Sequence, residues 1–480
     1  MKKICVFLLV LFLLPVFCSC NSNAPAVSEK AALRAGFGRV NITPNYSVPL
    51  GGYGRSVTRM SQGFLDYLYA TCVAVTDEND NTVLIVTTDL GSIESAIWEP
   101  LCQAVTAQTG VPAQQILVQA THTHSAPDMS VSEASAKKFK EEVTAGIVQA
   151  CVDAMADRSN ATMHTAEIYP EGMNFVRHYT LTDGTVYGDN FGSLTGGKIN
   201  GHTSEADNQL QLLLFKRDAE DKKDILSINW QGHPKMASTA DTPFGTAHRA
   251  QLSADYISPT RDYVETNTDC LFSFHLGASG NLNTISKIHS EQPTDDYKVY
   301  GELLGAYVVE ALKNVKLVEG TTIHSAQATY EAPIDKSEDH LYDAAWAAWS
   351  EWNSTGVFRA PAGSGLISSY HASSVIVRHN SKEVSRQFQL NAVSIGSVGF
   401  IAAPYEMFDT NGVFIKENSP FETTFVMTCS NGHYGYLAAD QAFTFNDNTG
   451  SYEAYNRLYP RGTAENLANI YVQLLNELKN

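Results

Sequence analysis

The stretch ILVQATHTHS, residues 116–125, is an apolar run that ends in two histidines. Ile116 to Val118 predict a buried strand, and Thr121-His122-Thr123-His124-Ser125 follows it. Side chains at positions i and i+2 of a strand lie on one face, so His122 and His124 can reach the same cavity. One imidazole would bind zinc, and the other would stand beside the metal as an acid/base group. The alternative is a pair of surface histidines at a strand end, and the motif alone does not choose between the two.

Further apolar segments predict strands that alternate with helices. The helix over Ser135–Met155 carries an apolar side chain at every fourth position, and a last helix spans the segment from Leu467 to Leu478. We therefore predict an α/β fold, a single large domain of mixed β-sheets flanked by helices, from Gly36 to the C-terminus. The other predicted strands are Val83–Val86, Ile225–Trp230, Leu271–Phe274, Val398–Ala402 and Thr424–Met427.

Three of these strands also end in residues that can bind a metal. His233 follows the strand that ends at Trp230, Glu406 follows Ala402, and Tyr434 and Tyr436 come after Met427. Imidazole, carboxylate and phenolate groups are all acceptable zinc ligands, and strand ends are common places for functional residues. Each residue also has a structural explanation. His233 could cap a turn before Pro234, Glu406 could favour a helix N-terminus, and either tyrosine could be core.

The N-terminus resembles a bacterial lipoprotein signal. Met1-Lys2-Lys3 precedes an apolar run from Ile4 to Phe17 and then Cys18-Ser19-Cys20. We expect residues 1–19 to be a signal peptide, Cys20 to be the lipidated residue, and residues 20–35 to be a tether that anchors the protein in the cell envelope. An ordinary cleaved signal or a membrane anchor is the alternative, although the run is short for a bilayer span.

Charge and cysteine content narrow the class of protein. The formal net charge is −18 and no block of basic residues is present, which excludes nucleic acid as an expected partner. The cysteines after Cys20 are too widely spaced for a zinc knuckle, and their number is odd. We expect buried free thiols at Cys72, Cys102, Cys151, Cys270 and Cys429.

Five segments resemble the catalytic domain of the neutral/alkaline non-lysosomal ceramidases, in the order that this family shows. The resemblance runs from about Gly36 to the C-terminus. The segments are Gly38 to Pro44, Pro49 to Gly54, Thr121 to Pro127, Trp230 to Pro234, and Asn431 to Tyr436 followed by Tyr452-Glu453.

The resemblance implies a set of site residues. The zinc ligands would be His122, His233, Glu406 and Tyr436, with Tyr434 as the competing tyrosine, and His124 would be the acid/base. Arg177 resembles the arginine that helps to hold the polar head of the substrate. Its alternative is a solvated surface arginine.

The sequence departs from the family at two places. The family has a serine above the metal in a Gly-Asp-Val-Ser-Pro-Asn segment. Here the equivalent stretch is Gly280-Asn281-Leu282-Asn283-Thr284, so Asn283 takes the position of that serine. An asparagine can donate a hydrogen bond to a carbonyl oxygen but cannot be acylated, and Ser279 could replace the serine only if the loop is shifted. The chain also ends without the C-terminal β-sandwich of the family.

These expectations combine into a zinc-dependent hydrolase of an N-acyl amide. By resemblance, the substrate would be ceramide, which yields a fatty acid and sphingosine. The aromatic segment from Tyr342 to Trp352 could line an acyl channel or belong to the core. A zinc hydrolase of a glycan or an acyl-sugar is the alternative enzyme, and a lipoprotein that only binds lipid or glycan is the alternative of another class.

Overall fold

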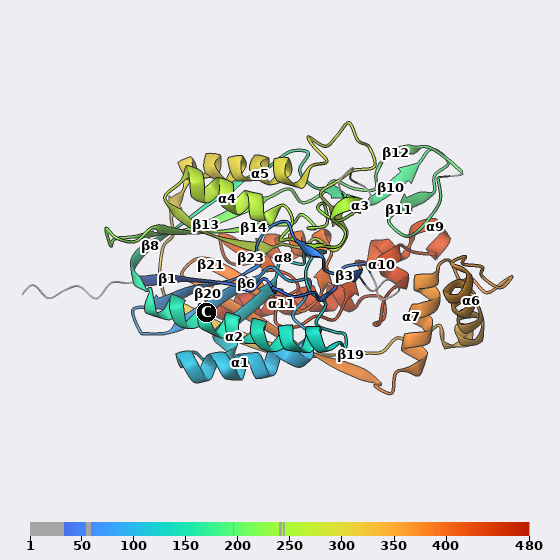
Figure 1. The fold of residues 1–480 in the computed structure, drawn as a ribbon, viewed down its shortest axis with the longest axis horizontal. Coiled ribbons are helices and arrows are strands. Elements are labelled where there is room, and N and C mark those ends of the chain that lie inside the picture. Colours follow the sequence, from blue (N-terminus) through green and yellow to red (C-terminus); the bar gives the residue numbers. More distant parts are fainter. Residues whose placement is uncertain (1–32, 54–58, 195, 240–241, 243–244, 480) are drawn as a thin grey trace, which may run out of the picture. The chain divides into compact units, whose positions relative to one another are not determined.

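A mixed nine-stranded sheet forms the centre of the α/β fold (Figure 1). The computed structural model describes residues 33–53, 59–194, 196–239, 242 and 245–479. The strand order is β16-β14-β13-β8-β1-β5-β6-β7, with β18 paired to β8. The pairs β6–β7 and β14–β16 are parallel, whereas the pairs between β6 and β14 are antiparallel. Their bounds are β1 Leu33–Asn41, β5 Tyr69–Asp77, β6 Thr82–Thr88, β7 Ile116–Ala120, β8 Ser159–Ile168, β13 Leu210–Arg217, β14 Asp224–Trp230, β16 Cys270–Leu276 and β18 Lys316–Leu317.

A second, four-stranded sheet has the order β19-β20-β21-β23. Its last two strands are parallel to each other. The bounds are β19 Ile323–Pro333, β20 Ser385–Ile395, β21 Val398–Ala402 and β23 Thr423–Met427.

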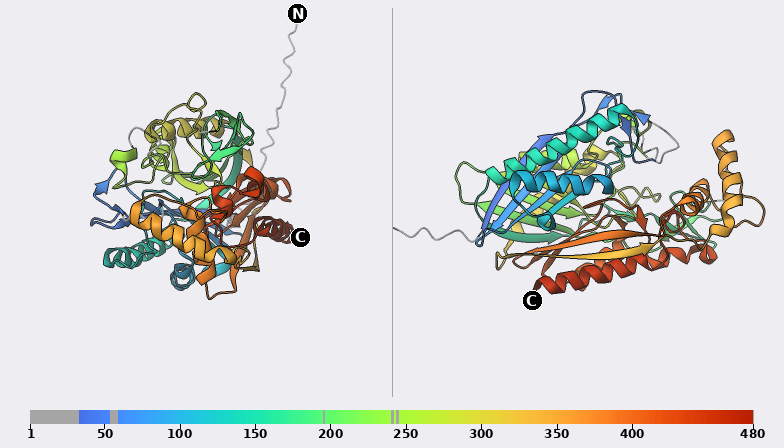
Figure 2. Two further views of the ribbon diagram at one scale, coloured as in Figure 1. Left: turned by 90° about the vertical axis from the view of Figure 1, so that its right-hand side faces the viewer. Right: turned by 90° about the horizontal axis from the view of Figure 1, so that it is seen from below.

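The two sheets pack face to face, and helices cover their outer faces. One buried cluster joins Val73, Ile85 and Leu117 of the large sheet to Phe400 and Phe425 of the small one. The outer face of the large sheet packs against α1, α2, α4 and α5, and that of the small sheet against α8 and α11 (Figures 1 and 2). The bounds are α1 Ser95–Thr109, α2 Ala134–Ala156, α4 Ile257–Asn267, α5 Tyr297–Ala311, α8 Asp409–Glu417 and α11 Thr463–Lys479.

Short elements complete the fold around the strand ends. A helical pair, α6 and α7, packs its small residues Ala345, Ala348 and Ala372 together. The remaining strands are β2 Pro49–Leu50, β3 Arg59–Met60, β4 Gly63–Phe64, β9 Phe175–Val176, β10 His178–Leu181, β11 Val186–Gly188, β12 Ile199–His202, β15 Gln251–Leu252, β17 Leu282–Asn283, β22 Glu406–Met407 and β24 Tyr436–Leu437. The remaining α-helices are α3 Gly245–His248, α6 Tyr342–Thr355, α7 Ser369–Asn380, α9 Phe445–Asn448 and α10 Tyr452–Tyr455.

The fold class predicted from the sequence is confirmed, and each of the predicted strands is present within a residue or two of its bounds. The predicted helix over Ser135–Met155 is α2, and the last predicted helix is α11. The five cysteines within the described ranges are buried and free, as expected. Across those same ranges, no helix combines the length and the apolar character that a bilayer span requires. The signal peptide and most of the tether predicted over residues 1–35 lie outside the described residues.

Candidate metal centre and active site

Gln119 ties together three strands whose carboxyl ends lead to the site. Its side-chain amide donates to the backbone oxygens of Leu276 and Thr428, both at 2.7 Å, and its oxygen accepts from the amide of Leu276 at 3.1 Å. These bonds link the end of β7 to the ends of β16 in the large sheet and β23 in the small one. A buried glutamine is stable here because its polar atoms have partners.

The loop after β23 is also bonded directly to β7. Asn431 exchanges two hydrogen bonds of 2.8 Å with the backbone of Val118, and Ala120 donates to the oxygen of Cys429 at 3.1 Å. Through these bonds the loop that carries Tyr436 lies beside the strand that precedes His122. Segments more than 300 residues apart in sequence therefore form one site.

Three histidines lie close together near the ends of these strands. The ring centroids of His122 and His233 are 4.8 Å apart, and that of His124 lies 5.3 Å from His122 and 4.9 Å from His233. One ring nitrogen from each histidine lies within 4.8 Å of the other two. His122 is 8% exposed and His124 is half-buried, so the alternative that these two are surface histidines is wrong.

Hydrogen bonds to backbone oxygens fix the tautomers of His122 and His233. His122 Nδ1 lies 2.7 Å from the oxygen of Gly91, and His233 Nδ1 lies 3.3 Å from that of Ser279. A carbonyl oxygen only accepts, so each ring carries a proton on Nδ1, and Nε2 is the atom left to bind a second proton or a metal ion. Metal-binding histidines are commonly held in this way.

Glu406, in the short strand β22 that follows β21, lies beside His122. Its Oε2 atom is buried, lies 3.2 Å from His122 Nε2, and accepts no regular hydrogen bond from the described residues. Burial raises the pKa of Glu406, but the charges of His122 and His433 outweigh it and hold the pKa well below its ordinary value. Glu406 lies in β22, and helix α8 begins only at Asp409, so its alternative role as a helix N-terminal carboxylate is wrong.

The donor set fits a divalent cation. Burial lowers the pKa of His122, yet the negative charge of Glu406 raises it well above its ordinary value. The point between these two side chains therefore attracts a positive charge, either a proton or a metal ion. Burial and the charge of His122 lower the pKa values of His124 and His233, which keeps both rings neutral.

Tyr436 and Tyr434 point to different surroundings. Tyr436 pairs with Glu406 across the parallel strands β22 and β24, and its ring lies 5.4 Å from the guanidinium carbon of Arg177. The hydroxyl of Tyr434 instead donates to the backbone oxygen of Gln387 at 3.3 Å, and its ring packs on Phe388 at 4.5 Å. Tyr436 is thus the phenol beside the charged groups of the site.

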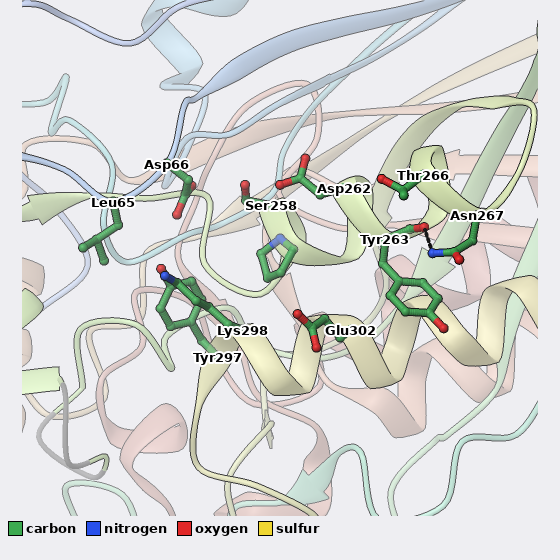
Figure 3. Close-up of a pocket in the computed structure, with 11 residues that line it drawn as sticks. Leu65, Asp66, Ser258, Asp262, Tyr263, Thr266, Asn267, Tyr297, Lys298 and Glu302 are labelled. Carbon is green, nitrogen blue, oxygen red and sulfur yellow. Dashed lines mark hydrogen bonds between the residues drawn. The ribbon is translucent and has the colours of Figure 1, made fainter.

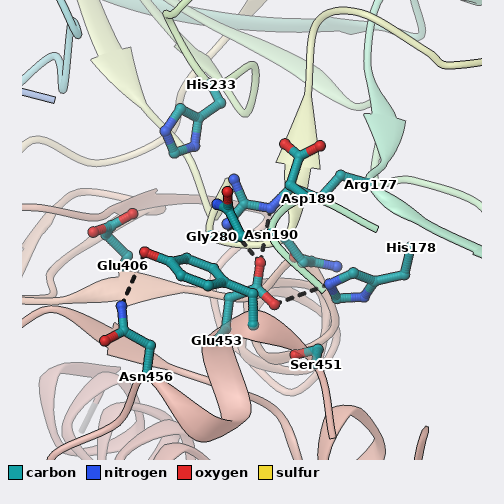
Figure 4. A network of polar contacts seen from close by, with 12 residues as sticks. Arg177, His178, Asp189, Asn190, His233, Gly280, Glu406, Ser451, Glu453 and Asn456 are labelled. Carbon is teal, nitrogen blue, oxygen red and sulfur yellow. Dashed lines mark hydrogen bonds and ion pairs between the residues drawn. The ribbon is translucent and has the colours of Figure 1, made fainter. Parts of the chain in front are cut away.

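Arg177 is the centre of a buried polar network (Figure 4). It forms an ion pair of 2.6 Å with Glu453 of α10, donates to the oxygen of Gly280, and is 4% exposed. Glu453 also accepts from His178 at 3.0 Å. The surface alternative for Arg177 is therefore wrong.

Asn283 lies in β17, which pairs with β9 just before Arg177. Its side-chain nitrogen donates to Asp189 at 3.1 Å, and its Oδ1 atom is buried without a hydrogen-bond partner in the described part of the chain. Only one of its two amide protons is used in this contact, so the other can be donated to a substrate oxygen. The contact of Ser279 with the site is through its backbone oxygen, which accepts a hydrogen bond from His233.

Two further residues, Cys429 and His433, were missed by sequence reasoning. Together with His122 they form a second group whose ligand atoms all lie within 4.8 Å of one another. Glu406 faces both groups, because its Oε1 atom lies 3.4 Å from His433 Nε2. His433 lies in the same short segment as Tyr436. Its position shortly after a predicted strand, in Asn431-Gly432-His433, was the only feature of the sequence that could have identified it as a candidate ligand.

Gly52, in the segment from Pro49 to Gly54, lies directly against the backbone of His124. Its φ is +98°, and a Cβ there would approach the Cα of His124 to 2.7 Å. Glycine alone fits this close approach. The neighbouring ring of Tyr53 meets the ring of His124 edge-on at 5.1 Å.

Two cavities adjoin the site and share Tyr370, Tyr436 and Tyr452 as walls. One, of about 820 Å³, runs from Glu406 toward α6 and α7 and includes Trp349 and Trp352 in its lining. The other, of about 400 Å³, adjoins His124 and Arg177 and is polar. A third cavity of about 450 Å³, between α4 and α5, is lined by a different set of residues (Figure 3).

Comparison with known proteins gives a family and a fold. Residues 33–238 match the family described as neutral/alkaline non-lysosomal ceramidase, N-terminal. The crystal structure of neutral ceramidase from Pseudomonas aeruginosa is similar, with a TM-score of 0.68 and 17% identity over 94% of this chain and 75% of that one. A structure described as ceramidase complexed with C2 has a TM-score of 0.66 and 16% identity over the same shares. No protein of curated function matches the sequence. The resemblance found in the motifs is confirmed, and the family indicates a hydrolase of the ceramidase type.

Proposed function

We propose that this protein is a zinc-dependent hydrolase that cleaves the amide bond of an N-acylated lipid. The match of residues 33–238 to the N-terminal domain of the neutral/alkaline non-lysosomal ceramidases supports this proposal. Ceramide, which would yield a fatty acid and sphingosine, is the first substrate to test. The observation that carries the proposal is the group formed by His122, His124 and His233, whose ligand nitrogens lie within 4.8 Å of one another, with the buried carboxylate of Glu406 3.2 Å from His122 Nε2.

Three residues support zinc as the metal, and Tyr436 could join them. Two neutral imidazoles and a carboxylate form a common catalytic zinc site, and a phenol is an acceptable further ligand. Bound zinc would act as a Lewis acid and lower the pKa of a water molecule toward neutrality. The buried position of the ligands protects that chemistry from bulk water.

The remaining residues would guide protons and charge. Because His233 carries its proton on Nδ1, His124 Nε2 donates to His233 Nε2 across 2.9 Å, and burial lowers the pKa of His124 and keeps its ring neutral. The lone pair of His124 is then on Nδ1, which has no hydrogen-bond partner among the described residues and would accept the proton. It would pass that proton to the leaving nitrogen, because an amine is a poor leaving group until it is protonated. The free amide proton of Asn283 would stabilise the developing oxyanion, and Arg177 would orient the polar part of the substrate.

The test is release of fatty acid from N-dodecanoylsphingosine, measured by mass spectrometry with zinc-loaded and chelator-treated protein. We expect release only from the zinc-loaded protein, loss of release in His122→Ala, and full release in the control His324→Ala, which changes an exposed histidine of β19. Protein that binds zinc but releases no fatty acid from ceramides or short N-acyl amides would be a binding protein rather than an enzyme.

We also propose that the protein is exported and lipid-anchored in the cell envelope, from the signal-like sequence that ends at Cys20. Labelling of the full chain with radioactive palmitate in a bacterial host tests this. Label is expected on the wild type and not on Cys20→Ser. Equal label on both would reject Cys20 as the lipidated residue.

A further inference from the structure

A second group of metal-binding side chains lies beside the proposed zinc position. His122, Cys429 and His433 each offer one ligand atom, and these three atoms all lie within 4.8 Å of one another. Only His122 also belongs to the group with His124 and His233. The loops after β7 and β23 thus bring two imidazoles and a thiol together, and the proposed hydrolysis uses neither Cys429 nor His433.

Backbone hydrogen bonds hold Cys429 and His433 in place. Cys429 is 1% exposed and has a φ of 51°, and its backbone oxygen accepts from the amide of Ala120 at 3.1 Å. The amide of His433 donates to the hydroxyl of Ser95, the first residue of α1, at 3.1 Å. The backbone of both residues is therefore fixed by contacts outside the group, so the side chains are positioned without an ion.

The free ring nitrogens of this group can take a further partner. His433 Nε2 is buried and makes no regular hydrogen bond with the described residues, although Glu406 Oε1 lies 3.4 Å from it. His122 uses Nδ1 to donate to the oxygen of Gly91, which leaves Nε2. Buried polar atoms usually have a partner, and a bound cation would supply one.

An ion can reach this group from the aromatic cavity of about 820 Å³. Glu406, Tyr434 and Gly435, which adjoin His433 in space or in sequence, line that cavity. The side chain of His433 is 22% exposed. The group is therefore open on one side, in contrast to the thiols of the core.

The types of ligand in this group favour copper. Two imidazoles and one thiolate are the principal ligands of many copper sites in proteins, and soft thiolate ligands select Cu⁺. Copper also binds a given set of nitrogen and sulfur ligands more tightly than zinc does. The first position offers imidazoles, a carboxylate and a phenol but no sulfur, which suits zinc.

We propose that His122, Cys429 and His433 form a copper-binding position that competes with the zinc position for His122. Because Nδ1 of His122 is bonded to Gly91, the ring can bind only one ion at a time, through Nε2. Copper held by Cys429 and His433 therefore removes a ligand from zinc. The consequence, loss of amide hydrolysis in the copper-loaded protein, rests on the function proposed above.

X-ray absorption spectroscopy tests the ligand set. The full chain is used with Cys5, Cys18 and Cys20 changed to serine in every sample, so that the N-terminal thiols do not bind the metal. The protein is treated with a chelator and loaded without oxygen with equimolar Cu⁺. We expect one sulfur and two nitrogen ligands. A copper ion without a sulfur ligand would overturn the proposal.

Variants identify which thiol is used. Competition with bicinchoninate should show that Cys429→Ser and His433→Gln each bind Cu⁺ at least about tenfold more weakly. Cys270→Ala is the matched control, because it removes a buried free thiol at the start of β16, and it should keep the affinity and the sulfur ligand. Equal affinity in Cys429→Ser and the wild type would also overturn the proposal.

Zinc binding tests the competition, and elemental analysis measures it. The wild type loaded with Cu⁺ should bind little added zinc, whereas Cys429→Ser without copper should bind zinc fully, which also shows that this variant is folded. Full occupancy by both metals at once in the wild type would reject the shared ligand. These measurements need no substrate, so they decide the copper position even if the protein hydrolyses no amide.

Discussion

His122 has a left-handed backbone conformation, with φ of 67°, which few residues other than glycine and asparagine adopt readily. Cys429 and Asn431, on the facing loop, also have positive φ, at 51° and 58°. Such a conformation costs roughly 1–3 kcal/mol and persists where the surroundings enforce it. Here the amide of His122 donates to the oxygen of Leu90 at 2.8 Å, and its ring is held by Gly91. This geometry turns the ring toward His233 and Glu406.

His122→Ala and His233→Ala should each lose bound zinc, because either change removes one of two convergent Nε2 atoms. Elemental analysis of the purified variants measures this. His324→Ala is the matched control and should bind as much metal as the wild type. Full zinc occupancy in either site variant would remove that histidine from the ligand set.

His124→Gln should keep its metal and lose turnover. The amide of glutamine can occupy the space but cannot carry a proton between water and a leaving nitrogen, so we expect a fall in kcat of about 10²–10⁴-fold. Metal content and kcat measured on one preparation separate the two effects. Loss of metal together with activity would make His124 a ligand instead.

Glu453 should make stability depend on pH at the acid end. Burial raises its pKa, but Arg177 and His178 outweigh burial and lower the pKa to about 2. A carboxyl group with a lowered pKa stabilises the folded state above its unfolded pKa, near 4.5, and loses this contribution as the pH falls through about 2. The contribution at neutral pH is of the order of 3 kcal/mol.

Glu453→Gln should therefore lower the free energy of unfolding at pH 7 by about 3 kcal/mol, because it leaves Arg177 buried without its counter-charge. The difference from the wild type should shrink as the pH falls toward about 2. Denaturant unfolding at several pH values measures this, with Glu477→Gln on the exposed face of α11 as control. A difference in unfolding free energy that does not change with pH would contradict the lowered pKa of Glu453.

At the scale of elements, parallel strands carry the site residues to one edge. The pairs β6–β7, β14–β16 and β21–β23 are parallel, so the two strands of each pair have their carboxyl ends together. Five antiparallel pairings separate β6 from β14, so the hydrogen bonds of Gln119, and not strand direction alone, place the end of β7 beside the end of β16. Gln119 and Asn431 then join the edges of the two sheets. The packing of the sheets brings His122 and His233, which follow strands of the large sheet, near Glu406 and Tyr436 of the two-stranded pair β22–β24, whose strands follow β21 and β23 in the chain.

Gln119→Leu should loosen this junction. It removes the partners of the backbone groups of Leu276 and Thr428, and each buried polar group left without a partner costs about 1–3 kcal/mol. We expect a lower free energy of unfolding and weaker zinc binding. Gln473→Leu, on an exposed position of α11, is the control. An unchanged zinc affinity would mean that the two sheets are aligned by their packing alone.

The strands could be predicted well because each buried strand is a short apolar run in the sequence and is followed by a polar turn. The small strands β22 and β24 gave no such signal, since two residues have no period. Cys429 and His433 were missed for a different reason. Their proximity to His122 depends on how the two sheets face each other, and that contact has no trace in local spacing.

At the scale of the whole molecule, the described part of the chain is a stack of two sheets between layers of helices (Figure 2). The site lies where the carboxyl ends of β7, β16 and β23 meet. Burial of each sheet on both faces supplies the rigid frame that a metal site needs. The helical pair α6 and α7 adds the aromatic wall of the larger cavity. The sequence predicted the frame, whereas the division into an aromatic and a polar cavity required the structure.

An anomalous difference map, calculated from diffraction data at the zinc absorption edge of crystals of the zinc-loaded protein, tests the central claim most directly. We predict one dominant peak within about 2.0–2.3 Å of His122 Nε2, His233 Nε2 and a carboxylate oxygen of Glu406. A dominant peak bound instead by Cys429 and His433, or no peak among these residues, would contradict the account.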